Sequence, residues 1–177
     1  VGTADQSLVT DGSGVLSFAS RSRLVRATAV ATTSGTSIDF TSIPSWVRRI
    51  TVMFDGVSTN GTSAVQVQLG DSGGVETTGY SGGAASITSS VAAYAAFSSG
   101  FVPPGSAAAS LRVGLLTIVN IDSNVWVASG TFDDGATFAG IAQGAKTLSA
   151  TLDRVRLTTV NGTDTFDAGT VNIMYEG

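Results

Sequence analysis

The strongest constraint on the fold is a strict alternation of side chains within residues 45–56. Apolar residues occupy every second position of its centre, namely Ile50, Val52 and Phe54. Polar residues and one methionine fill the positions between them. Successive side chains of a β-strand point to opposite faces, so the pattern predicts a strand with one face on a core. Pro44 precedes the stretch and Gly56 ends it, and the segments around it are the expected pairing partners.

Composition extends this expectation to the whole chain. The 177 residues suffice for one domain with a sizeable core. Twenty-two glycines and few long helix-forming side chains favour many short strands joined by tight turns. Charged residues make up only 12% of the chain. So few charges favour association, and we expect the chain to bury additional surface against copies of itself.

Several classes of chemistry are disfavoured by the residues that the sequence lacks. It contains no cysteine and no histidine, which removes disulfides, thiolate and imidazole metal ligands, and Ser-His-Asp or Cys-His catalysis. The net charge of −4 disfavours binding to nucleic acid, which needs clustered lysine and arginine. No apolar run approaches the length of a membrane span, so we expect no membrane insertion.

Turn signals divide the chain into short strands. Asn60-Gly61 separates residues 48–57 from residues 64–69, and asparagine-glycine readily adopts the positive φ angles of a hairpin turn. We therefore expect these two segments to pair as an antiparallel hairpin. Asp134-Gly135 and Asn161-Gly162 are further signals of the same kind.

Residues 111–121 are predicted to form a central strand. Leu115, Leu116, Ile118 and Val119 make its middle apolar on both faces, which predicts burial on both sides. Counting such segments gives eight to ten strands without alternating helices. This is typical of an all-β, antiparallel β-sandwich of the jelly-roll type. We expect a short N-terminal segment, residues 1–24, leading into a sandwich domain formed by residues 25–177.

Residues 77–110 do not fit this scheme and are expected to form a long excursion. The helical spacing of Ile87, Val91 and Tyr94 competes with a strand over residues 93–97. Long loops in compact domains often carry function, and exposed aromatic side chains on loops commonly contact sugars or protein partners. The candidate receptor-binding residues are the aromatic side chains of this region, namely Tyr80, Tyr94, Phe97 and Phe101.

The acidic residues do not form a recognisable catalytic or metal site. Asp133 and Asp134 are adjacent, but Asp134-Gly135 is explained as a turn, and the only glutamates are Glu76 and Glu176. The segments 122–124 and 164–167 offer oxygen ligands without the spacing of a helix-loop-helix calcium site. A phosphate-binding glycine loop is also missing. We predict no catalytic residue, no metal and no cofactor.

Four segments resemble parts of bacteriophage proteins. Residues 4–18 resemble a short glycine-punctuated repeat common in tail fibres. Residues 38–54, 152–169 and 171–176 are similar to a domain often found at the C-terminal end of phage and prophage tail proteins. The resemblance implies a distal tail-fibre or baseplate-associated module that is usually trimeric, lies outside the host cell and takes part in adsorption. It carries no catalytic residues to transfer.

These observations lead to three hypotheses. The first is a non-enzymatic virion protein, the distal domain of a tail fibre, which forms a homotrimer with other tail proteins nearby and binds a host cell-surface glycan or protein. The second is a purely structural virion module, such as a fibre joint, collar or capsid decoration, without a receptor. The third is a glycan-degrading depolymerase.

Overall fold

The computed structural model describes residues 6–20, 23–105, 107–108 and 110–177. These residues form fifteen strands and no helix. The strands are β1 (Gln6–Thr10), β2 (Leu16–Ser20), β3 (Leu24–Arg26), β4 (Val30–Ala31), β5 (Ser37–Phe40), β6 (Arg49–Thr59), β7 (Val65–Asp71), β8 (Gly74–Val75), β9 (Tyr80–Ile87), β10 (Ala92–Phe97), β11 (Arg112–Asp122), β12 (Val125–Asp133), β13 (Ala139–Thr147), β14 (Arg154–Thr159) and β15 (Phe166–Glu176). The all-β, antiparallel class is confirmed, with more strands than the eight to ten expected.

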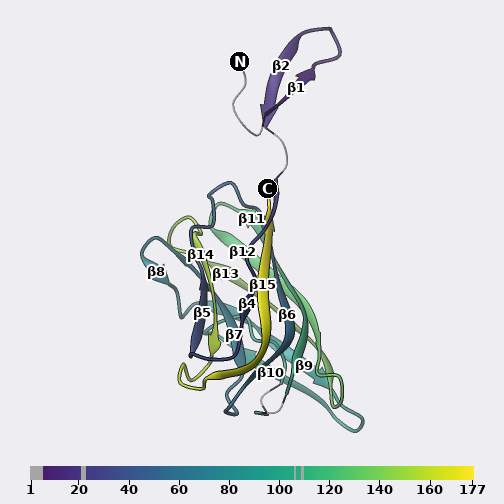
Figure 1. Cartoon of the computed structure of the whole chain (residues 1–177), viewed down its shortest axis with the longest axis vertical. Coiled ribbons are helices and arrows are strands. Elements are labelled where there is room, and N and C mark those ends of the chain that lie inside the picture. The colour runs from purple at the N-terminus through teal and green to yellow at the C-terminus, as the bar shows by residue number, and fades with distance from the viewer. Residues whose placement is uncertain (1–5, 21–22, 106, 109) are drawn as a thin grey trace.

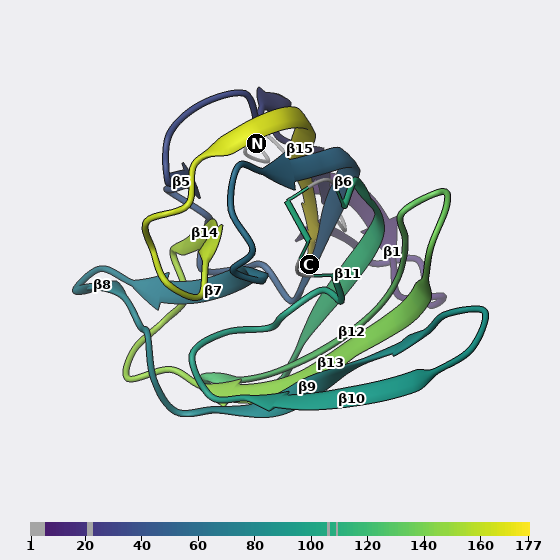
Figure 2. The same ribbon diagram turned by 90° about the horizontal axis from the view of Figure 1, so that it is seen from below.

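The strands of the body form two sheets of unequal size (Figure 1). The larger sheet has nine strands in the order β10-β9-β13-β12-β11-β6-β15-β3, with β4 also paired to β15. The smaller has four, in the order β5-β14-β7-β8. Figure 2 shows the large sheet curving around the small one, with β12, β13 and β9 in the layer farthest from β5.

Both sheets contribute alternate residues to a single core. Strand β6 contributes Ile50, Val52 and Phe54, the alternating apolar residues of the predicted strand, and all three are buried. The small sheet faces them with valines and leucines, namely Val65, Val67, Leu69, Val155 and Leu157. Removing this apolar surface from water is the main favourable contribution to folding such a sandwich.

A glycine in β11 allows two aromatic rings to meet inside the large sheet. Gly114 is paired with Phe54 of β6 on one side and with Phe132 of β12 on the other. Because Gly114 has no side chain between them, the two rings make an edge-to-face contact with centroids 5.4 Å apart. This contact joins the three central strands on the core side.

The predicted hairpin between residues 48–57 and 64–69 is wrong. Strand β6 pairs with β11 and β15, whereas β7 lies in the other sheet and pairs with β14 and β8. The chain after Asn60-Gly61 therefore crosses between the sheets instead of turning back along β6. Asn161-Gly162 likewise lies in a connection that crosses between the sheets, from β14 to β15.

The two crossing connections hold each other. The backbone N–H of Asn60 donates to the carbonyl of Thr165 at 2.9 Å, and the Thr165 N–H donates to Oδ1 of Asn60 at 2.9 Å. The Ser63 N–H donates to Oδ2 of Asp164 at 2.9 Å. Each connection thus finds its hydrogen-bond partners in the other one, which explains how an asparagine-glycine pair serves a crossover as well as a hairpin.

The turn predicted at Asp134-Gly135 is confirmed, because it joins β12 to its antiparallel partner β13. The Asp122-Ser123-Asn124 segment forms another turn, which joins β11 to β12. The expected long excursion over residues 77–110 is wrong in its first part, because β9 and β10 form a paired hairpin at one edge of the large sheet. Alanine, glycine and serine dominate these two strands, so they lack the apolar alternation that identifies a strand.

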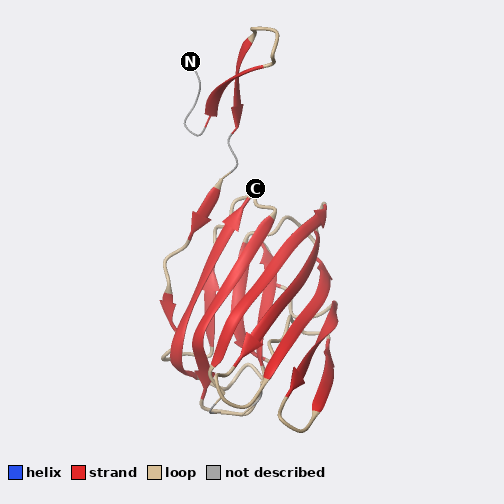
Figure 3. Ribbon diagram, turned by 90° about the vertical axis from the view of Figure 1, so that its right-hand side faces the viewer, coloured by secondary structure: helices blue, strands red, loops and turns tan. Residues whose placement is uncertain are grey.

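The chain enters and leaves the body at the same end. The Arg23 N–H donates to the Gly177 carbonyl at 3.0 Å, and Leu24 already lies in β3, beside Glu176 of β15. The β1–β2 hairpin extends beyond this end, along the long axis of the body (Figure 3). Residues 1–5 and 21–22 of the predicted N-terminal segment lie outside the described residues.

Gly114→Ala should destabilise the domain by about 1–3 kcal/mol, because overpacking a filled core forces its neighbours to shift. A Cβ at this position would collide with the Thr131 carbonyl oxygen and lie 2.9 Å from Cδ1 of Phe132, at a φ of 154°. Denaturant unfolding measures the change. The control Thr147→Ala, at an exposed strand end, should stay within about 0.5 kcal/mol of the parent. Equal stability of both variants would contradict the packing described around Gly114.

Candidate binding surfaces

Two of the four predicted receptor-binding residues lie in the core. Tyr80 is 5% exposed and Phe101 is 1% exposed, and their rings make an edge-to-face contact with centroids 5.2 Å apart. The Tyr80 hydroxyl accepts a hydrogen bond from the Leu69 N–H at 2.7 Å and donates to the Glu76 carbonyl at 3.0 Å. Burial raises the pKa of Tyr80 above its ordinary value. The expectation that these two rings lie on an exposed loop is therefore wrong.

The reason is a backbone pairing that the sequence does not reveal. Phe101 forms an antiparallel bridge with Val67, with reciprocal N–H to carbonyl bonds of 2.9 and 2.8 Å. This bridge pins the chain after β10 to the small sheet and turns the Phe101 ring into the core. Its two neighbours, Val102 and Pro103, are also buried.

Tyr94 and Phe97 lie together on β10, apart from the buried pair. Tyr94 is 67% exposed, and its ring lies against Gly83 of β9, where a Cβ would collide with it. Phe97 is half-buried and lines an apolar cavity of about 180 Å³ with Ala84 and Pro104. The structure thus brings together two of the four residues, and a receptor contact at Tyr94 or Phe97 stays a prediction.

The turn that closes the β9–β10 hairpin is well ordered by its own hydrogen bonds. The Thr88 N–H donates to the Val91 carbonyl at 2.9 Å, and the Thr88 hydroxyl oxygen accepts from the Val91 N–H at 3.1 Å. Ile87 and Val91 flank this turn and are exposed. The hairpin therefore presents apolar side chains on a defined backbone at the end of the body opposite Gly177.

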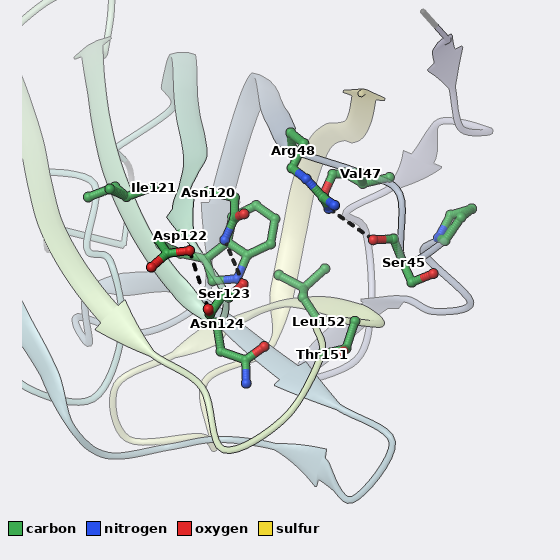
Figure 4. Close-up of a pocket in the computed structure, with 12 residues that line it drawn as sticks. Ser45, Val47, Arg48, Asn120, Ile121, Asp122, Ser123, Asn124, Thr151 and Leu152 are labelled. Carbon is green, nitrogen blue, oxygen red and sulfur yellow. Dashed lines mark hydrogen bonds between the residues drawn. The ribbon is translucent and has the colours of Figure 1, made fainter. Parts of the chain in front are cut away.

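A larger and more polar cavity, of about 540 Å³, lies at the end of the body where Arg23 pairs with Gly177. Figure 4 shows the residues that line it. It is formed by the segment before β6, the β11–β12 turn and residues 151–152. Arg48 donates from Nη1 to the carbonyls of Ser45 and Val47, both at 2.9 Å. Asn120 donates from Nδ2 to the carbonyls of Ser123 and Val125 at 3.0 and 3.1 Å. The side chains of Arg48 and Asn120 thus hold the walls of this cavity.

One polar atom among the residues that line this cavity has no partner. The Trp126 side chain is buried, and its indole N–H finds no acceptor in the described part of the chain. A buried donor without an acceptor costs about 1–3 kcal/mol. Nothing in the sequence indicated a cavity beside this ring.

The acidic side chains serve the structure. Glu76 forms an ion pair with the buried Lys146 and accepts a hydrogen bond from the Ser149 N–H at 2.7 Å. Burial acts to raise the pKa of Glu76, but the bonds from Lys146 and Ser149 outweigh it, and the pKa lies below its ordinary value. In the described ranges, no three His, Cys, Asp or Glu side chains cluster closely enough to hold a metal ion.

Asp134 caps the turn between β12 and β13. Its Oδ1 accepts the N–H groups of Ala136, Thr137 and Phe138 at 3.1, 2.6 and 3.0 Å. Slight burial acts to raise the pKa of Asp134, but these bonds and one from the Thr137 hydroxyl hold it well below the ordinary value. The adjacent Asp133 accepts the Gly135 N–H. The two neighbouring carboxylates are therefore turn caps.

Arg112 is a buried cation of a different kind. Its guanidinium donates to the carbonyls of Gly105 and Ser110, and its Nε has no acceptor among the described residues. Burial lowers the pKa of Arg112 to about 10. The side chain therefore fastens the segment before β11 at the far end of the sandwich and stays charged at neutral pH.

Comparisons with known proteins add no assignment, because no protein-family model and no curated protein matches the chain. No helix long and apolar enough to cross a bilayer occurs in the described part of the chain.

Asp134→Ala should lower the free energy of unfolding at neutral pH by about 1 kcal/mol or more, because it leaves three turn N–H groups without their acceptor. Since the folded pKa lies below 3.8, the carboxylate's contribution is present above the unfolded pKa and is lost as the pH falls through the folded value. Denaturant titrations at neutral pH and at about pH 3 measure this. The difference between parent and variant should shrink at the lower pH, and a difference that grows there would contradict the capping role.

Proposed function

We propose that the chain is a non-enzymatic distal domain of a virion tail fibre, which attaches the particle to a glycan or protein on the host cell surface. In this proposal it acts outside the host cell, as a homotrimer in contact with other tail proteins. The proposal is supported by the resemblance of residues 38–54 and 152–169 to phage tail proteins. It is also supported by a fold in which the carboxylates hold turns and ion pairs.

The observation that carries the proposal is that the two ends of the body differ in what they carry. The chain enters beside Arg23 and reaches Gly177 at the same end, where the two residues exchange backbone hydrogen bonds. The opposite end carries the β9–β10 turn, the β12–β13 turn and the two interlocked crossovers. A domain held by its terminal end would leave these connections free to meet a surface, as the tip of a fibre requires.

The β9–β10 hairpin has the surface chemistry best suited to such a contact. Residues 77–111 contain no charged side chain. Ile87, Val91 and Tyr94 expose apolar surface on it, and Tyr94 adds a hydroxyl to an aromatic face. An aromatic ring that stacks and forms hydrogen bonds is suited to sugars and to protein surfaces alike.

A single small contact of this kind binds weakly. Three copies in one fibre would engage a repetitive cell surface at the same time, because the second and third contacts form at a high effective concentration. The proposal therefore requires a modest surface on each copy and no deep pocket.

Tyr94→Ala should slow adsorption of virions that carry the variant by about tenfold or more, because loss of an exposed aromatic anchor typically removes over 1 kcal/mol per contact. Tyr94→Phe keeps the ring and should lose less. Leu24→Ala removes an exposed apolar side chain from β3, at the opposite end of the body, and it should adsorb normally. Normal adsorption of Tyr94→Ala, with unchanged folding, would exclude this surface, and failure of the purified chain to compete for host cells would favour the purely structural module.

A further inference from the structure

The outer side of β11 is apolar and uncovered. Val113, Leu115, Val119 and Ile121 are 36–63% exposed along one side of this strand, while Leu116 and Ile118 on the other side are fully buried. The sequence predicts burial on both sides, and a single copy of the chain satisfies only the inner one. Exposed apolar side chains in a contiguous patch usually mark an interaction surface.

The uncovered surface continues across three neighbouring strands. The registers of β11, β12, β13 and β9 place their outward residues in four rows of four. The rows are Val113, Asp133, Ala139 and Ile87; Leu115, Thr131, Ile141 and Ala85; Thr117, Ser129, Gln143 and Gly83; and Val119, Val127, Ala145 and Ser81. We call these sixteen positions the outer β11–β9 face. Asp133, in the row nearest the β12–β13 turn, is the one charged residue among them.

Soluble sheets with one free face normally cover it with charged and polar side chains. This face instead carries mostly small, branched and apolar residues, with Asp133 and Gln143 as its two longer polar side chains. Small and apolar residues are the set that packs one sheet against another at about 10 Å. Strands about 4.8 Å apart, with outward residues about 6.8 Å apart along each strand, give four strands and four rows a flat area of about 500 Å². That is most of the roughly 800 Å² that each partner buries in a stable protein interface.

We propose that the outer β11–β9 face is the contact surface between copies of this chain. The near absence of charge lets this face meet a neighbouring copy without strong charge repulsion, which a face rich in one sign of charge would not allow. The contact would cover the outer sides of Leu115 and Ile141 and complete the two-sided burial that the sequence of β11 predicts.

The direction of the strands also supports another copy of the chain as the partner at this face. The strands of the large sheet run roughly along the long axis of the body (Figure 3). Copies packed side by side through this face with parallel axes would bring their β1–β2 hairpins together at one end. These hairpins expose Leu8, Leu16 and Phe18, and an isolated two-stranded hairpin is marginally stable in water. The β9–β10 turn would remain free at the other end.

This inference names the surface behind the proposed homotrimer and rests on the proposed function only for the number of copies. Leu115→Lys places a charge in the face and should convert the assembly to monomers in sedimentation experiments. Val160→Lys places the same charge at an exposed apolar position outside the face and should leave the assembly intact. A parent chain that sediments as a monomer, or a Leu115→Lys assembly that persists, would overturn the inference.

A second measurement avoids dependence on a disruptive charge. The chain has no cysteine, so a single introduced thiol is its only site for maleimide labelling. Thr131→Cys lies in the face, and Val160→Cys lies outside it; both positions are exposed in a single copy. Labelling at position 131 should be more than about tenfold slower than at position 160, because an interface core excludes solvent. Equal rates would overturn the inference.

Adsorption is not a readout in either experiment. A protected position 131 together with normal adsorption of Tyr94→Ala would leave the interface standing and remove the proposed receptor contact. An accessible position 131 together with impaired adsorption of Tyr94→Ala would exclude the interface and leave the proposed receptor contact standing. Tyr94 lies on β10 at the edge of the face, with its ring against Gly83, so the sedimenting species of Tyr94→Ala must match that of the parent before a change in its adsorption is assigned to the receptor contact.

Discussion

The structure depends on the face-to-face packing of two unequal antiparallel sheets. Strand β6 is central to it, because β6 pairs with β11 and β15 and directs Ile50, Val52 and Phe54 at the valines and leucines of the small sheet. Every other feature follows from how the chain moves between these layers. The connections that cross from one sheet to the other carry asparagine, aspartate and glycine, whose side chains and backbone close the hydrogen bonds that the strands leave open.

The inequality of the sheets has consequences for function. A nine-stranded sheet cannot be covered by a four-stranded one, so β10 is exposed along nearly its whole length. The outer side of β11, which faces away from the small sheet, is apolar and exposed as well. The two uncovered regions suit different tasks. The broad, flat and nearly uncharged face suits repeated copies of one chain, whereas the narrow hairpin at the far end suits a foreign surface.

The sequence was informative where a local pattern decides the local structure. The alternation in β6 and the Asp134-Gly135 turn were predicted correctly because side chains within a few residues determine both. The sequence did not predict strand pairing or burial where a partner distant along the chain determines it. Asn60-Gly61 signals a turn but does not say which sheet the next strand joins, and Phe101 is buried because it bridges to Val67. The strands β9 and β10 were not predicted, because alanine and glycine give no periodic pattern of apolar residues.

We propose that recognition occurs on connections at the end of the body opposite Gly177, and that the cavity beside Trp126 takes no part. Hydrogen exchange of the chain, with and without a host envelope fraction, tests this most directly. We predict slower exchange at residues 87–94 on binding and unchanged exchange at residues 44–48 and 120–126. Protection confined to the residues around the cavity, with the β9–β10 hairpin unaffected, would contradict the claim.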